Sequence, residues 1–540
     1  MEDTEMAEMY PLFKKFVDDV ARLFKNPGGD PEDKLKGPIQ TLFADFGRTL
    51  RKDVALNNEF RDVEISARPD FGVYVDGQLR GYIELKAPGK GANPDSFKGG
   101  HDLSQWKKFR DEYSNIIYTD GNEWSWYRRT IVETDAVTRV AVPLVKQPQS
   151  FAIPGDVRQG GDGAINLAVA DSLSVMLAGF FENLPIVPKN AKQLAHVLAP
   201  HCRNLRKTVR WVLNRPDSFL AEQAQGWREI LFSDADDDQF ADAFAQTVTY
   251  ALLLARLEND KIPRDGLDCQ SAAATLRKGH ELLSEVLWLL TSEDVRNEIG
   301  GGVQLLEQAI GAVDPAALKR RRVKGKHIQE EEYDPLIYFY EDFLSAYDPE
   351  LRKNRGVYYT PKEVVHAQTV IIDELLRKEL KKKDGFISDG VVVLDPAVGT
   401  GTYPLTIISH ALDSYCARYG EEELAGAATY LSENIHAFEI LVGPYAVAQM
   451  RISQELRSAG AQIPKDGVHV YFTDTLESPD KPSTLFAGLK RLSQEHERAR
   501  QIKQSTRVLV CVGNPPYDRE QNKPDQEKER RKGGMGTIRR

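Results

Sequence analysis

The chain has 540 residues, of which 41% are hydrophobic and 28% charged, and its formal net charge is -10 at pH 7. This length exceeds what a single hydrophobic core supports, so several domains are expected. The composition is that of an ordinary soluble protein. The acidic balance neither indicates nor excludes a nucleic-acid partner, because phosphate binding depends on local patches of positive charge.

The sequence shows no export or disulfide signal. Its acidic start, "MEDTEMAEMYPLFKKF", has no uninterrupted apolar core, and the apolar runs elsewhere are too short to cross a membrane. The four cysteines lie far apart without a CxxC pair, which argues against disulfides and cysteine-rich zinc sites. We therefore expect a cytoplasmic protein with no membrane partner.

Residues 1–148 mix helical and strand patterns. The stretch "VEISARPDFGVYVDGQLRGYIELKAP" predicts two strands joined by an Asp-Gly turn, "QWKKFRDEY" predicts a helix, and "NIIYTDGNEWSWYRR" predicts a second strand pair. Strands interleaved with helices indicate an α/β domain. The Gly- and Asp-rich passage "AIPGDVRQGGDGAIN" that follows is typical of a linker.

Residues 149–346 read as an almost wholly helical connector. Apolar side chains recur there at three- and four-residue steps, as in Phe240, Phe244, Val248, Ala251 and Ala255. The basic run Lys319–Lys326 allows two interpretations, a solvated loop or a patch that contacts phosphate.

Residues 347–540 alternate helix and strand, and four apolar strands with helical connections predict a parallel, doubly wound sheet. Polar groups stand where these strands end. Asp395 ends the first and precedes the turn through Gly399 and Gly401, Glu439 ends the second, Asp474 the third, and "NPPY" from Asn514 the fourth. Carboxyl ends of parallel strands meet at one edge, so we expect these groups to face one crevice. The glycine turn alone is equally consistent with a turn that binds no ligand.

A second group of polar residues lies in the first domain. Glu84 and Lys86 are two apart on a predicted strand and so project from one face, and Asp70 on the partner strand can join them across the hairpin. Two hard oxygen ligands suit Mg²⁺, and a lysine beside them can orient an attacking water and stabilise charge on phosphate. These three positions alone also fit an ordinary surface hairpin.

The third segment resembles the adenine-N6 DNA methyltransferases in which the cofactor motif precedes NPPY. This resemblance implies S-adenosylmethionine as cofactor and double-stranded DNA as substrate. It implies that cofactor contacts come from "RGVYYTPKEVV" and from the strand ends, namely Tyr359, Thr360, Pro361, Asp395, Pro396, Gly399, Gly401, Glu439 and Asp474. Asn514 and Pro515 would accept the two amino protons of adenine, Pro516 would stiffen the loop, and Tyr517 would stack on the flipped base. Direct transfer needs no cysteine, so Cys511 is interpreted as a buried strand residue.

The first domain resembles the PD-(D/E)xK nucleases, with "RPD" and then "ELK". The resemblance implies that Asp70 and Glu84 hold Mg²⁺, that Lys86 is catalytic, and that Gln105 in "HDLSQWKKF" belongs to the site. An upstream acid is also implied, either Glu59 or Glu64, whereas His101 is interpreted as a polar loop residue. With "YFYEDFLSAYDPELRKNRGVYYTP", the whole chain resembles type ISP and type IIG restriction-modification enzymes. No GxxxxGK[ST] motif occurs, so the type IIG layout fits better.

Only a charged stretch follows Tyr517, so we expect an incomplete methyltransferase domain that lacks its last strands and a target-recognition domain. Either a second polypeptide supplies these parts, or the chain is a truncated form or the product of an interrupted reading frame. The leading hypothesis is a restriction-modification protein of phage defence that cuts DNA with Mg²⁺ and methylates adenine. One alternative is a non-catalytic or half-active subunit of a split complex. Another is a methyltransferase that acts on RNA or protein.

Overall fold

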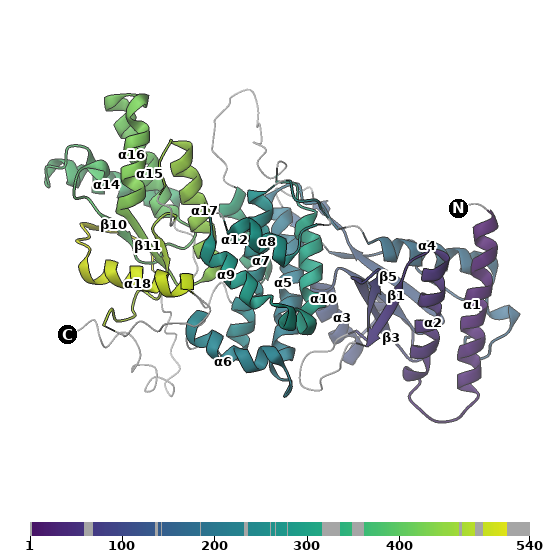
Figure 1. Ribbon diagram of the computed structural model, residues 1–540. Coiled ribbons are helices and arrows are strands. Elements are labelled where there is room, and N and C mark those ends of the chain that lie inside the picture. Colours follow the sequence, from purple (N-terminus) through teal and green to yellow (C-terminus); the bar gives the residue numbers. More distant parts are fainter. Residues whose placement is uncertain are drawn as a thin grey trace, which may run out of the picture. The chain divides into compact units, whose positions relative to one another are not determined.

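The structure is a computed structural model of the 540-residue chain. It describes residues 3–58, 69–134, 139–141, 143–183, 185–231, 236–259, 261–264, 266–277, 279–315, 335–347, 361–463, 467–480 and 490–515. The chain divides into two compact units, which Figure 1 shows as mixtures of helices and strands. Unit 1 comprises Met1–Ala224, Pro263–Asp265 and Glu293–Leu318, and unit 2 comprises Gln225–Ile262, Gly266–Ser292 and Lys319–Arg540. The expected α/β class is confirmed, and the three-domain division stays a prediction.

A mixed seven-stranded sheet forms the centre of unit 1. Its strands are β1 (Val54–Asn58), β2 (Phe71–Val75), β3 (Gln78–Leu85), β4 (Asn115–Thr119), β5 (Glu123–Arg129), β8 (Leu144–Lys146) and β9 (Phe151–Ala152). The order is β1-β2-β3-β4-β5-β8, and β9 also pairs with β5. Among the described pairings of this sheet, only that of β3 with β4 is parallel, and α3 (Gly100–Glu112) connects these two strands. The Asp76-Gly77 turn joins β2 to β3, as the sequence predicted, and both residues have positive φ.

Two hydrophobic cores cover the two faces of this sheet, because successive strand residues point to opposite sides. One face packs on α1 (Asp3–Phe24), α2 (Asp33–Thr49) and α4 (Leu167–Glu182) through a core that includes Ile83, Leu85 and Ile117. The other face packs on α3 and α10 (Glu293–Gly311) through a core that includes Tyr82 and Tyr118. Helix α10 lies against α5 (Ala191–Leu213). A small hairpin, β6 (Val132–Thr134) with β7 (Arg139–Ala141), completes the unit.

The passage interpreted as a linker packs against unit 1 instead. Ile153, Val157 and Ile165 are buried in the core that α1, α2 and α4 form. A short 3-10 helix spans Asp162–Ala164, and the side chain of Asn166 then caps α4 by accepting the backbone N–H of Val169. The glycines provide turns, but the interleaved apolar residues hold the segment on the domain. The linker interpretation was therefore wrong.

A four-stranded parallel sheet lies in unit 2. The strands are β10 (Val393–Asp395), β11 (Ile435–Glu439), β12 (Val470–Phe472) and β13 (Val510–Cys511), in the order β12-β11-β10-β13. All three pairings are parallel, as expected. The chain moves from β10 outward through β11 to β12 and then returns to the far side of β10. Strand order therefore reverses between β10 and β13, the kind of position where open α/β sheets bind ligands.

Helices make up most of the remaining described part of unit 2. Those described are α7 (Asp237–Glu258), α8 (Cys269–Leu276), α9 (Glu281–Leu290), α12 (Pro335–Tyr347), α14 (Lys362–Lys378), α15 (Thr402–Tyr419), α16 (Leu424–Asn434), α17 (Val442–Ser458) and α18 (Lys490–Ser505). Helix α6 (Phe219–Leu231) spans the boundary between the units. The predicted stripe on α7 is confirmed, since its five apolar side chains are fully buried. Pairs of these helices pack directly, notably α17 on α7 and α14 on α15.

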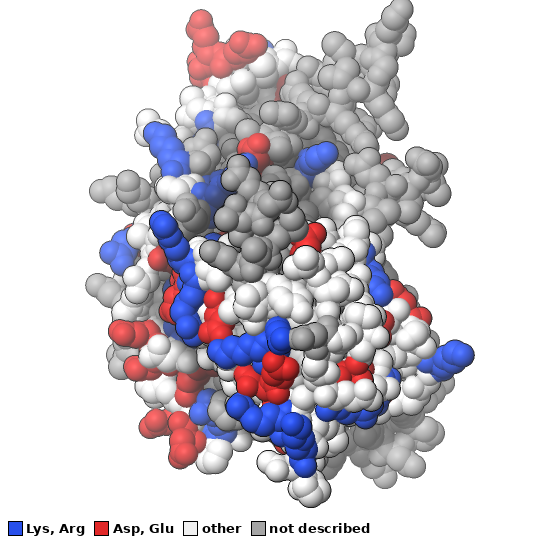
Figure 2. All heavy atoms as spheres, turned by 90° about the vertical axis from the view of Figure 1, so that its right-hand side faces the viewer, with Lys and Arg blue, Asp and Glu red and all other residues white. Residues whose placement is uncertain are grey.

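Charge and hydropathy add two observations. In Figure 2, the described lysine and arginine side chains stand among acidic and uncharged residues on the face that carries α1. Among the helices that the structure describes, none combines the length and hydropathy that a bilayer crossing requires.

Candidate functional sites

The predicted Glu-Leu-Lys motif ends β3 inside unit 1. Lys86 donates hydrogen bonds of 2.8 Å both to Oε1 of Glu84 and to Oε1 of Gln105, which lies on α3. All three side chains are buried, and Leu85 points to the opposite face of the sheet, into the core. The connection from β3 through α3 to the parallel strand β4 brings the helix over the end of β3. The structure thus places Glu84, Lys86 and Gln105 together.

Asp70 lies one residue before β2, in line with Glu84 across the hairpin, because Phe71 pairs with Ile83. Its Oδ2 accepts the backbone N–H of Leu85 at 2.8 Å, and its Oδ1 lies 3.9 Å from the ammonium of Lys36 on α2. Only 3% of Asp70 is exposed. Asp70 therefore joins the same strand end as Glu84, and Lys36 is a neighbour that the sequence pattern did not indicate.

A third carboxylate, Asp102, completes the surroundings of Lys86. It lies one helical turn before Gln105 on α3, and its Oδ1 is 3.3 Å from the ammonium of Lys86. Burial opposes the charge of Lys86, but Glu84 and Asp102 outweigh it and raise the pKa of Lys86 above its ordinary value. The three-residue spacing to Gln105 is the signal that could have identified Asp102.

The chemistry of these residues fits a hard divalent cation. Asp70 and Glu84 supply carboxylate oxygens at one strand end, and Mg²⁺ commonly takes one or two carboxylates and completes its shell with water and phosphate. Within the described part of the chain, no group of three or more His, Cys, Asp and Glu side chains is arranged to hold a metal ion. The magnesium prediction rests on this pair. Glu59 and Glu64 lie outside the described residues. His101 is exposed, but it lies in the first turn of α3 and not in a loop, so that part of its interpretation was wrong.

The glycine turn after β10 has the backbone that its sequence requires. Gly399 and Gly401 have φ of +56° and +92°, in the left-handed region that favours glycine. The side chain of Glu439, which ends the neighbouring strand β11, accepts the N–H of Gly399 at 2.9 Å. It also accepts the N–H groups of Ile440 and Leu441. Glu439 thus holds the glycine turn, and one of the roughly four lone-pair positions of its carboxylate is left for a ligand hydroxyl.

Gly513 brings the fourth strand end against the first. A Cβ built on Gly513 would lie 2.5 Å from Oδ1 of Asp395 and 3.0 Å from Cδ of Pro396. No side chain fits there without displacing one of these groups. Asn514 and Pro515 follow at once, so the strand pairing of β10 with β13 places them beside Asp395.

Asp395 is almost fully buried, and its Oδ1 accepts the N–H of Ala397 at 3.1 Å. Its Oδ2 is buried and accepts no hydrogen bond within the described residues. Burial and the nearby charge of Glu439 raise the pKa of Asp395 to about 7, although the N–H of Ala397 opposes this shift. Burial raises the pKa of Glu439 as well. A buried acceptor without a donor is suited to a ligand that brings one.

The third strand, β12, is an outer strand of the described sheet. Asp474 is exposed, and its Oδ1 accepts the N–H of Leu476 at 2.8 Å. The next residue, Thr475, donates its hydroxyl to the carbonyl oxygen of Pro396, so the loop after β12 contacts the loop after β10. The structure therefore brings Asp395, Pro396, Gly399, Gly401, Glu439 and Asn514 to one edge of the sheet, with Asp474 at its margin.

Several predicted positions cannot be placed. Tyr359, Thr360, Pro516, Tyr517 and the basic run Lys319–Lys326 lie outside the described residues. Pro361 immediately precedes α14.

Cys511 is a strand residue, as expected, but its side chain is exposed rather than buried, so that interpretation was wrong. Among the described strands β13 is the last in the sheet order, which leaves one side of it without a neighbouring strand.

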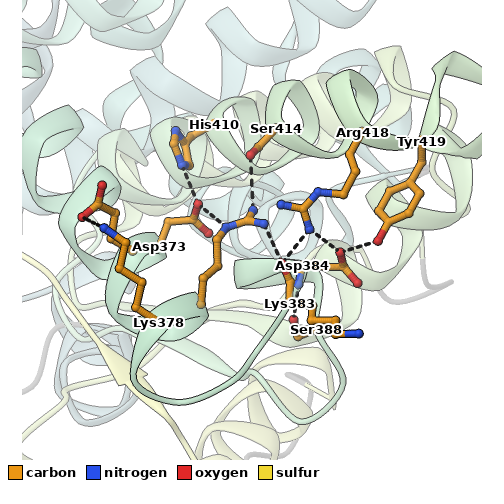
Figure 3. A network of polar contacts seen from close by, with 11 residues as sticks. Asp373, Lys378, Lys383, Asp384, Ser388, His410, Ser414, Arg418 and Tyr419 are labelled. Atoms are coloured by element: carbon orange, nitrogen blue, oxygen red, sulfur yellow. Dashed lines mark hydrogen bonds and ion pairs between the residues drawn. The ribbon is translucent and has the colours of Figure 1, made fainter.

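A polar network fixes α14 on α15 (Figure 3). Asp373 on α14 accepts from Arg377 at 2.8 Å and lies 3.2 Å from Nε2 of His410 on α15. Arg377 also donates to Ser414 on α15. Near the glycine turn, Tyr403 donates to Gln368 at 2.6 Å. These contacts link the helix that follows Pro361 to the helix that follows Gly401, so the network has a positioning role.

Residues 331–537 match the family model described as "N-6 DNA Methylase". This part of the chain therefore carries a domain of that family. No protein of curated function matches the chain.

Solved structures similar to the chain include restriction enzymes. A DrdV–DNA complex is 21% identical with a TM-score of 0.38, covering 95% of this chain and 44% of that one. The type ISP enzyme LlaBIII bound to DNA is 20% identical with a TM-score of 0.42, covering 66% and 22%. The type IIG endonuclease BpuSI is 12% identical with a TM-score of 0.28, covering 92% and 46%. The chain thus spans less than half the length of each.

Proposed function

We propose that unit 2 transfers a methyl group from S-adenosylmethionine to the N6 amino group of adenine in DNA. The match of residues 331–537 to the N-6 DNA methylase model supports this reaction class. The observation that carries the proposal is the close approach of Gly513 to Asp395 and Pro396, because the Asn514-Pro515 segment follows Gly513 directly and the glycine turn that Glu439 holds follows Pro396. S-adenosylmethionine would supply an electrophilic methyl group on sulfur.

The residues of the chain would act as follows. The glycine turn allows backbone to approach the cofactor, and Glu439 accepts a ribose hydroxyl. Adenine N6 is a poor nucleophile because its lone pair is delocalised into the ring. The side-chain oxygen of Asn514 and the carbonyl oxygen of Pro515 would each accept a hydrogen bond from one N–H of the adenine amino group. These two hydrogen bonds favour a pyramidal nitrogen with its lone pair directed at the methyl group. Pro516 and Tyr517 are proposed to stiffen this loop and stack on the flipped base.

Transfer of a labelled methyl group to DNA tests this function. Wild-type protein is expected to label N6 of adenine in unmethylated phage DNA, and Asn514→Ala is expected to lose about 100-fold or more in rate, by analogy with removal of one preorganised acceptor or donor. Label in cytosine, in RNA or in protein would overturn the substrate assignment. Asn57→Ala on β1 is a matched control, since it lies in the other unit.

We propose as a second activity that unit 1 cleaves DNA with Mg²⁺. The convergence of Asp70, Glu84, Lys86 and Gln105 at the end of β3 favours it. Asp70 and Glu84 would hold the ion, which when bound polarises the phosphate and lowers the pKa of a water. Lys86 would orient the attacking water and stabilise charge on the phosphate, and Gln105 would fix the position of Lys86.

Cleavage of unmethylated phage DNA, with Mg²⁺ and with a chelator, tests the second activity. Asp70→Ala and Lys86→Ala should each abolish Mg²⁺-dependent cleavage. A wild type whose activity equals that of both variants would overturn it. With both activities, the chain would cut unmodified DNA and mark adenines in its own, as a restriction-modification protein does, with double-stranded DNA as its partner.

A further inference from the structure

One ion-pair cluster at the end of β3 extends beyond the residues assigned above. Asp102 contacts two ammonium groups. Its Oδ1 lies 3.3 Å from Nζ of Lys86, and its Oδ2 lies 3.1 Å from Nζ of Lys90. An acid in the first turn of a helix is common, because it complements the positive end of the helix dipole. That general preference explains an acid at this position but not a bridge between two lysines.

Lys90 belongs to a loop whose backbone is held in place. The loop from Ala87 to Ala92 follows directly on Lys86, and Gly89 and Gly91 have φ of +87° and +88°. Oδ2 of Asp120, in the turn between β4 and β5, accepts both of their N–H groups at 3.0 Å. Oε2 of Glu123 accepts the N–H of Ala92 at 2.9 Å. The backbone of the loop is therefore fixed from the neighbouring strands.

Asp102 on α3 also holds this loop, through an ion pair with the side chain of Lys90. Lys86, Asp102 and Lys90 form a continuous chain of charged contacts from the buried end of β3 to the surface, where about half of the Lys90 side chain is exposed. Gln105 holds the same ammonium from the next turn of α3. Lys86 consequently has its position set by Glu84 on its own strand and by two side chains of α3. A change at Asp102 would release Lys90 and would leave Lys86 held by Glu84 and Gln105 alone.

We propose that Asp102 is a positioning residue of the nuclease site, which orients Lys86 and ties it to Lys90. This inference rests on the proposed DNA cleavage by unit 1. Asp102 would not touch the reacting atoms. It would act by keeping the Lys86 ammonium directed at the carboxylate of Glu84 and at the substrate phosphate, while Lys90 would be held at the mouth of the site, where it can contact a neighbouring phosphate of the DNA backbone.

Single-turnover cleavage by the full chain with Mg²⁺ tests the inference, together with DNA affinity measured with Ca²⁺ in place of Mg²⁺. Asp102→Asn should lower the cleavage rate about ten- to hundredfold, the usual cost of a misplaced catalytic group, and should leave DNA affinity within about threefold. Asp102→Glu should restore part of the rate. In a double-mutant cycle, Lys90→Gln should cost less in the Asp102→Asn background than in wild type.

Asp111→Asn is the matched control on the same helix, because Asp111 is exposed and paired only loosely with Arg110 at 3.7 Å. It should cleave as wild type does. A wild-type rate in Asp102→Asn would overturn the inference. The inference would also fail if the fold losses in cleavage rate caused by Asp102→Asn and Lys90→Gln simply multiplied in the double variant, because the two residues would then act independently. A loss of rate that matches a loss of folded protein, measured by circular dichroism, would overturn it as well. A wild type that does not cleave would overturn the nuclease function itself, which is a distinguishable result.

Discussion

The α-carbon of Gly513 faces the carboxylate of Asp395 so closely that an added Cβ would lie 2.5 Å from Oδ1. This relationship joins the first and the fourth strand ends of the unit 2 sheet. It makes a small change at Gly513 a test of the arrangement.

Gly513→Ala should lower the free energy of unfolding by about 1–3 kcal/mol, because an extra methyl group in a packed site forces its neighbours to move. Methyl transfer should fall with it, since Asn514 would shift. Chemical denaturation and the labelled-methyl assay measure the two effects. Gly426→Ala on α16 is the control, because a Cβ there meets no atom within 4 Å. That control should stabilise the protein slightly, as alanine is the better helix former. Equal free energies of unfolding and equal methyl-transfer rates in Gly513→Ala and Gly426→Ala would contradict the close approach of Gly513 to Asp395.

The raised pKa of Asp395 predicts a dependence of stability on pH. A carboxyl group whose pKa is higher in the folded state than in the unfolded state favours folding while it is protonated. Its contribution is full below the unfolded pKa of about 4 and is lost as pH rises to about 7, the folded pKa. The cofactor-free protein should therefore lose up to a few kcal/mol between pH 4 and pH 7 from this group. In scanning calorimetry across this range, Asp395→Asn should flatten the change, and an unaltered slope would refute the assignment.

Lys86→Ala should destabilise unit 1 as well as abolish cleavage. Removing the ammonium leaves the buried carboxylate of Glu84 without its strongest counter-charge, which typically costs about 3–5 kcal/mol. Adding Glu84→Gln removes that charge, so the double variant should recover most of the stability and none of the activity. Urea denaturation measures the difference. If Lys86→Ala is as stable as wild type, the ion pair does not contribute as proposed.

The Asp373 network should contribute to the stability of unit 2. Asp373→Ala removes the acceptor of Arg377 and the partner of His410, and should cost about 2–4 kcal/mol because the group is buried. Glu374→Ala, on the next residue, breaks only the exposed pair with Lys378 and should change stability by less than about 0.5 kcal/mol. Thermal melts compare the two, and similar losses would contradict a specific role for the network.

The local pattern of the sequence predicted where several residues of both candidate sites lie. Alternation along β3 placed Glu84 and Lys86 on one face and Leu85 on the other, because side-chain direction in a strand is fixed by its two-residue period. Parallel strands also required Asp395, Glu439 and the Asn514 segment to lie at one edge of the sheet. These expectations follow from geometry that a few residues determine.

Other features depend on contacts between distant segments. The approach of Gly513 to Asp395 follows from the pairing of β10 with β13, which no single motif reveals. Lys36, which lies 3.9 Å from Asp70, belongs to α2, a helix that is separated from Asp70 in the sequence by β1. The passage after β9 looked like a linker because its glycines and aspartates dominate the composition, yet Val157 and Ile165 anchor it. Exposure of Cys511 likewise depends on its strand's place in the sheet.

Calorimetry of S-adenosylmethionine binding to the full chain tests the central claim most directly. We expect one binding site per chain, with the affinity weakened at least about tenfold by Glu439→Ala and by Asp395→Ala, and unchanged by Glu374→Ala. Absence of binding heat at several temperatures, or equal affinity in all four proteins, would contradict the claim that these strand ends form a cofactor site.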